Sequence, residues 1–146
     1  MSNRTIARDA IVSGLENLKR SESARVKDFE ISPRYLTAEE TNTKQTYCVI
    51  VTDETRNPQT LKHDNYELTA LQVLYAHDTK DPRAKLDLMI EDAIETVLLA
   101  LVDIKETVWK VVLESISTDE GSTASQPWAQ AVLRWSLSHR RKAFAA

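Results

Sequence analysis

The spacing of apolar residues along the chain predicts two amphipathic helices. Residues 5–19 place small and apolar side chains on one face at about 100° per residue, and the small ones allow a close approach to a sheet. A second helix is predicted from Asp81 or Pro82 to about Leu101 or Asp103. Its start is indicated because an aspartate accepts hydrogen bonds from first-turn amides and proline is favoured at the first helical position. The apolar faces consist of Ala7, Ala10, Ile11, Gly14, Leu15 and Leu18 in the first helix and of Leu86, Ile90, Ala93, Ile94, Val97 and Leu101 in the second.

Five further segments have the composition of strands. Residues 46–52 (TYCVIVT) form a nearly continuous apolar run and are predicted to lie in the middle of a sheet. Residues 66–76 alternate between two faces, and the pattern leaves open which face meets the core. Strands are expected at 24–31, 46–52, 66–76, 108–117 and 128–139, and the two possible core sets of the third are Leu71, Val73 and Tyr75 or Leu68, Ala70 and Leu74.

The resulting order, α-β-β-β-α-β-β, predicts an α+β fold. Its sheet is expected to be mostly antiparallel, connected by hairpins, and covered by the two helices on one face. A chain of 146 residues fits one domain. We predict a single domain over residues 1–139 and a flexible basic tail over residues 140–146.

Composition and charge narrow the classes of function. With 42% hydrophobic residues, 28% charged residues and a net charge of -3, the chain has no general attraction for nucleic acid or membranes. Its two glycines are too few for a phosphate-binding loop or a dinucleotide-binding motif. The N-terminal residues lack the apolar run of a secretory signal, and the lone Cys48 lies in an apolar segment. We therefore expect a soluble protein of a reducing compartment, with a buried structural thiol.

The histidines do not predict a metal site. His63 and His77 lie at opposite ends of one predicted strand, about 40 Å apart if it is straight. His139 is followed by two arginines, which disfavour a cation. We expect no metal and no cofactor.

Acidic residues do not predict catalysis either. Asp87, Glu91 and Glu95 recur every four residues along the second helix, as the solvated side of an amphipathic helix does. No serine stands in a turn with the geometry that a nucleophile requires. The sequence therefore favours a protein that is not an enzyme.

One pattern suggests contact between subunits. Leu88 and Leu99 fall nearly opposite the apolar stripe that contains Ile90, beside Asp92 and Glu95. Single exposed leucines are common on protein surfaces, which is the alternative interpretation. Together with the edge strands of an open sheet, however, these four residues favour a self-associating structural protein.

The order and lengths of the elements resemble those of the tail terminator proteins of long-tailed bacteriophages, also called minor tail or tail completion proteins. The resemblance covers nearly the whole chain, through TIARDAIVSGLENL, TYCVIV, YELTALQVLYA, DPRAKLDLMIEDAIETVLLAL, VWKVVLES and WAQAVLRWSLS. It implies a virion protein that assembles in the host cytoplasm as a hexameric ring on the tail tube. Such a ring ends tail elongation at the head-proximal end and offers a surface to the head–tail connector or neck protein.

Two polar loops are candidates for contact with the tube or the connector. They are residues 37–45, which contain Glu39, Glu40 and Lys44, and residues 118–126. The first loop lacks apolar anchors in the sequence, so we expect it to be mobile in the free subunit and to become ordered against the tube or a neighbouring subunit. The alternative interpretation is a tolerated surface insertion. The alternatives to a tail terminator are another head–tail connector, such as a neck or stopper protein, and a small α+β enzyme or ligand-binding domain.

Overall fold

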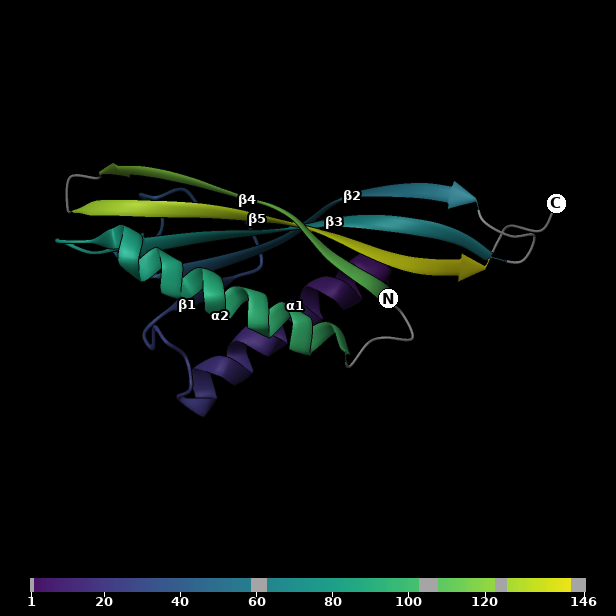
Figure 1. Cartoon of the computed structure of the whole chain (residues 1–146), viewed down its shortest axis with the longest axis horizontal. Helices are drawn as coiled ribbons and strands as arrows, with labels where there is room; N and C mark the ends of the chain where they lie inside the picture. Colours follow the sequence, from purple (N-terminus) through teal and green to yellow (C-terminus); the bar gives the residue numbers. More distant parts are fainter. Residues whose placement is uncertain (1, 59–62, 103–107, 123–125, 143–146) are drawn as a thin grey trace.

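The computed structural model describes residues 2–58, 63–102, 108–122 and 126–142. Both helices lie against one face of a twisted five-stranded sheet, which confirms the predicted α+β fold (Figure 1). The strand order is β1-β2-β3-β5-β4, and every neighbouring pair is antiparallel except β1 and β2. The elements are α1 (Asn3–Ser21), β1 (Glu30–Ser32), β2 (Thr46–Pro58), β3 (His63–His77), α2 (Pro82–Val102), β4 (Val108–Ser122) and β5 (Pro127–Lys142).

Helix α1 follows the predicted pattern, with one difference. Ser2 caps it by accepting a hydrogen bond from the amide of Thr5 at 3.2 Å. Gly14 of its small face, however, lies against α2. A Cβ on Gly14 would lie 3.0 Å from Cγ2 of Thr96 and 3.1 Å from Cβ of Ala100. The two helices therefore pack closely at a position where α1 has no side chain.

Helix α2 starts as predicted, because Asp81 accepts a hydrogen bond from the amide of Ala84 at 3.0 Å. Its buried face is rotated slightly from the predicted stripe. Ile90 and Ile94 are only half-buried at the rim of the core. The buried residues are Leu86, Met89, Asp92, Ala93, Thr96, Val97 and Leu101.

The structure decides which face of β3 meets the helices. Leu68, Ala70 and Leu74 belong to the large core cluster that contains both helices. The opposite face carries a second, smaller cluster. It is formed by Cys48, Val73 and Tyr75 and is covered in part by Leu36 and Ala38 of the segment between β1 and β2. Cys48 is buried, as predicted, and burial raises the pKa of its thiol.

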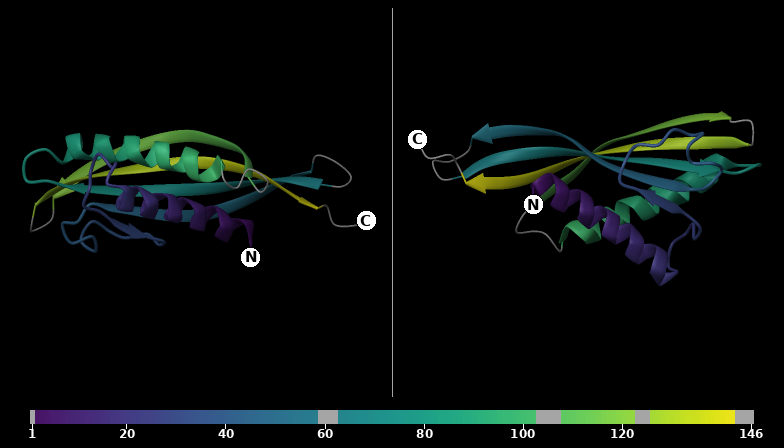
Figure 2. Two further views of the ribbon diagram at one scale, coloured as in Figure 1. Left: turned by 90° about the horizontal axis from the view of Figure 1, so that it is seen from below. Right: turned by 180° about the vertical axis from the view of Figure 1, so that it is seen from behind.

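Several strand predictions are wrong in position. Of the predicted strand 24–31, only the last two residues are in β1, which forms an edge beside β2, while Ala24, Val26 and Phe29 reach the core from irregular backbone. β2 lies between β1 and β3 and is therefore an interior strand, although β3 is the middle one of the five. β2, β3, β4 and β5 run beyond their predicted ends. The ends of β2, β3 and β5 project past both helices (Figures 1 and 2).

The predicted tail is partly in the sheet. The backbone of residues 140–142 continues β5 and pairs with residues 63–65 of β3. Residues 143–146 lie outside the described residues. No helix in the described part of the chain is long and apolar enough to span a membrane.

Candidate interaction surface

Four large apolar side chains on α2 are exposed to solvent. The sequence predicted Leu88 and Leu99, which are 45% and 72% exposed. It missed Leu98 and Val102, which are 48% and 62% exposed. All four lie on the side of α2 that faces away from the sheet. Leu88 and Leu99 are eleven residues apart, Leu99 and Val102 are three apart, and Leu98 and Val102 are four apart, which are spacings that keep side chains on one side of a helix. We call these four residues the exposed α2 surface.

Of the two acidic residues predicted beside the leucines, Glu95 is exposed and Asp92 is not. Asp92 is only 2% exposed, and it accepts hydrogen bonds from the amide and from Nη1 of Arg25, at 2.8 and 2.7 Å. Glu95 is exposed and accepts from Nη1 and Nη2 of the same guanidinium, at 3.0 and 2.8 Å. These hydrogen bonds lower the pKa of Glu95 and raise that of Arg25. Both carboxylates thus fasten the segment after α1 to α2, and Asp92 is not on the surface.

The 37–45 segment is folded into a defined turn. The Glu40 carboxylate accepts a hydrogen bond from the amide of Thr37 at 3.1 Å, and the Thr37 hydroxyl accepts from the amide of Glu40 at 3.4 Å. This reciprocal pair is a capping box. The Thr37 amide is the main cause of the lowered pKa of Glu40, and Arg34 lies 3.5 Å from the same carboxylate. Glu39 remains exposed.

Contacts with β3 attach this turn to the sheet. Thr41 is buried, donates to the carbonyl of Ala38 at 2.6 Å, and lies 2.7 Å from Nε2 of His77. The Gln45 side chain accepts from the His77 amide at 2.6 Å and donates to the His77 carbonyl at 3.1 Å. Desolvation by burial lowers the pKa of His77. The segment therefore has polar anchors on the sheet, which its sequence pattern did not indicate.

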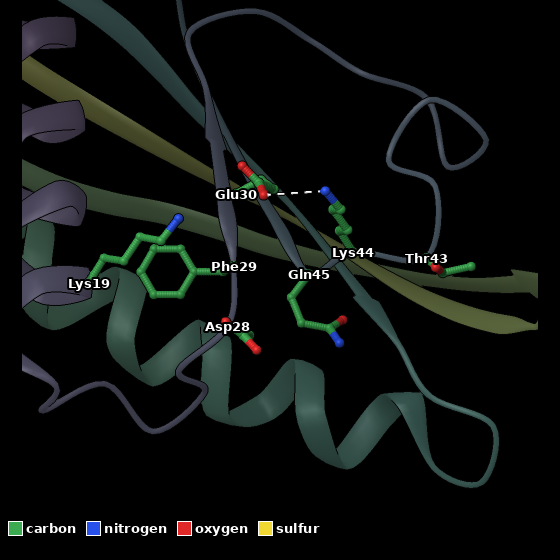
Figure 3. Close-up of a pocket in the computed structure, with 7 residues that line it drawn as sticks. All are labelled: Lys19, Asp28, Phe29, Glu30, Thr43, Lys44 and Gln45. Atoms are coloured by element: carbon green, nitrogen blue, oxygen red, sulfur yellow. Dashed lines mark ion pairs between the residues drawn. The ribbon is translucent and has the colours of Figure 1, made fainter.

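Lys44 borders a hollow of about 360 Å³ between the end of α1 and the first two strands (Figure 3). Its ammonium lies 3.6 Å from the Glu30 carboxylate, and Lys19 lies over the ring of Phe29 at 5.8 Å. With Asp28, the lining has two cations and two anions, so it has no net charge with which to select an ion. Within the described residues, no group of three or more histidine, cysteine or acidic side chains is placed to hold a metal ion.

Comparison with known proteins gives no assignment. No protein-family model matches the sequence, and no similar curated protein was found.

Proposed function

We propose that this chain is a structural virion protein that caps the tail tube of a long-tailed bacteriophage, ends tail elongation and provides a surface for head–tail joining. Its partners are then further copies of itself in a hexameric ring, the tail tube protein and the head–tail connector or neck protein. The proposal is supported by the resemblance in the order and lengths of the elements. The observation that carries it is the exposed α2 surface on a subunit whose core is already closed by other residues.

The exposed α2 surface is suited to contact between proteins. Burying a leucine or valine side chain stabilises a complex by about 1.5–3 kcal/mol, before the costs of association. Apolar side chains gathered on one face of a monomer commonly mark an interface. Beside these residues, Arg25 and Glu95 are already paired with each other.

Assembly into a ring sets a geometric condition. A closed ring needs heterologous contacts, so the exposed α2 surface must meet a different surface of the next subunit. The turn with Glu39 and Glu40 lies on another part of the molecule, so it is free for contact with the tube or the connector. β4 continues to Ser122, so the second candidate loop is shorter than predicted, and residues 123–125 lie outside the described residues.

The test is electron microscopy of the purified chain mixed with tail tubes that lack a terminator. We expect rings at one end of the tubes, tubes of fixed length, and loss of both with Leu99→Glu. Ser13→Glu adds the same charge to an exposed position of α1 and is expected to have no effect. Folded protein that leaves the tubes unchanged contradicts the proposal. Rings that bind the head connector and not the tube instead indicate a neck or stopper protein.

A further inference from the structure

The two edges of the sheet are protected to different degrees. At one edge, β1 covers the start of β2, and the guanidinium of Arg4 donates to the carbonyls of Val51 and Thr52. At the other edge, β4 pairs only with β5 within the described residues (Figure 1). Side chains 114–120 of β4 are exposed on both faces of the sheet. An edge strand with free amides and carbonyls is a template for pairing with another strand.

The charges along β4 indicate which strand fits this edge. Lys110 lies near one end of the strand and Asp119 near the other, and both are exposed. An antiparallel copy of the same strand places each lysine opposite an aspartate, whereas a parallel copy in register places like charges together. We propose that β4 pairs with β4 of a second copy of this chain, antiparallel, around a two-fold axis at Ser115.

The pairing of β4 with β5 sets the register. Residues directly opposite each other in an antiparallel pair lie on the same face of the sheet. One face of β4 carries Lys110, Val112, Ser115, Ser117 and Asp119, which pair with even-numbered residues of β5, and the other carries Val111, Leu113, Ile116 and Thr118, which pair with odd-numbered ones. With Ser115 opposite itself, the cross-strand pairs are Lys110–Asp119, Val111–Thr118, Val112–Ser117 and Leu113–Ile116, and each pair shares a face.

The irregularity in the middle of β4 is compatible with this register. The register shifts between Leu113 and Ser115, so Glu114 is the extra residue of a bulge. Its carboxylate lies 3.8 Å from Nε of Arg134 on the neighbouring strand β5. Pairing also covers Val112 and Ile116, which are 41% and 44% exposed in the single subunit. This pairing uses a different surface from the exposed α2 surface, and it does not rest on the proposed function.

Cross-linking tests the position of the axis. Opposite residues in an antiparallel pair have Cα atoms about 4.5–5.5 Å apart, within disulfide range. Under oxidised glutathione, we expect Ser115→Cys to form a disulfide-linked dimer at least about tenfold faster than Ser117→Cys, whose own copies lie about 13 Å apart along the paired strands. Cys48 is buried and does not compete. Equal rates for the two variants, or no dimer with Ser115→Cys, would overturn the proposal.

Charge reversal tests the pairing itself. By sedimentation velocity, we expect dimers that form as the protein concentration rises. Lys110→Asp or Asp119→Lys should raise the dissociation constant of the dimer about tenfold or more, because each substitution places two like charges opposite each other at both symmetry-related pairs. The double variant restores the opposite charges and the dimer. Lys27→Asp and Asp28→Lys alter exposed positions away from β4 and serve as controls. A chain that stays monomeric at high concentration, or a double variant without recovery, contradicts self-pairing and indicates that another protein occupies the edge.

Discussion

Replacing Gly14 by alanine tests the close packing of α1 on α2, which positions the exposed α2 surface. Two opposing effects are set by the structure. Alanine raises the stability of a helix interior by roughly 0.8–1.0 kcal/mol relative to glycine. The added Cβ, however, meets Cγ2 of Thr96 at 3.0 Å and Cβ of Ala100 at 3.1 Å, and overpacking costs about 1–3 kcal/mol.

The steric effect is expected to prevail. Thr96 cannot rotate away freely, because its hydroxyl donates to the carbonyl of Asp92 at 2.7 Å. We therefore expect Gly14→Ala to lower the free energy of unfolding by about 1 kcal/mol, the difference between the two effects. Urea denaturation followed by tryptophan fluorescence measures it.

A second substitution separates the two effects. Thr96→Ser removes Cγ2 and keeps the hydroxyl, so Gly14→Ala in that background recovers part of the helix-propensity gain. We expect a coupling free energy of at least about 0.5 kcal/mol between the two positions. Ser13→Ala, at an exposed neighbouring position, is the control for propensity alone. If Gly14→Ala stabilises the unaltered chain as much as this control does, the helices are not in contact at Gly14.

Three further predictions concern the core and its polar groups. The buried indole N–H of Trp135 donates a hydrogen bond to Gln72 at 2.8 Å, and Gln72→Leu removes this acceptor. The substitution should lower the free energy of unfolding, measured by urea denaturation, by about 1–3 kcal/mol. An unchanged free energy of unfolding would contradict the hydrogen bond. Because folding lowers the pKa of His77, this residue contributes fully to the free energy of unfolding above its unfolded pKa of about 6.5. That contribution falls as the pH decreases through and below this value. The urea midpoint should therefore decrease between about pH 7.5 and about pH 5, and less so in His77→Gln. Leu86→Ala should cost about 2–5 kcal/mol, and Ile94→Ala less, because Leu86 is fully buried and Ile94 is at the rim; equal losses would place Ile94 in the core.

The helices were the most predictable elements, because several local signals agree there. An apolar period near 3.6 and the Asp81–Pro82 start together define α2, and its observed span matches the prediction closely. The strands were located but cut short. In β4, the missed residues 118–122 (TDEGS) include no large apolar side chain, so no apolar alternation marks them as a strand. These residues form a strand because they pair with β5, and nothing in the local sequence indicates that pairing.

The error over residues 24–29 has a different cause. Ala24, Val26 and Phe29 are buried by a segment that passes along the core without joining the sheet. When an irregular segment buries nearly every second side chain, its sequence shows the same alternation of apolar and polar residues as a strand. Asp92 illustrates the same limit for the candidate surface, because its partner Arg25 is 67 residues away and nothing in the local pattern of α2 indicates it.

The segment between β1 and β2 shows what this packing means for function. Leu36 and Ala38 cover Cys48 and Tyr75 on the face of the sheet that has no helix. Releasing the segment would expose that cluster and break the hydrogen bonds that Thr41 makes within the turn and to β3. Fixing the backbone of one residue costs about 1–2 kcal/mol of conformational free energy, and in this turn the residues are already fixed when the chain folds. A partner that binds the turn therefore meets a preformed surface, and its affinity is not reduced by ordering a mobile loop.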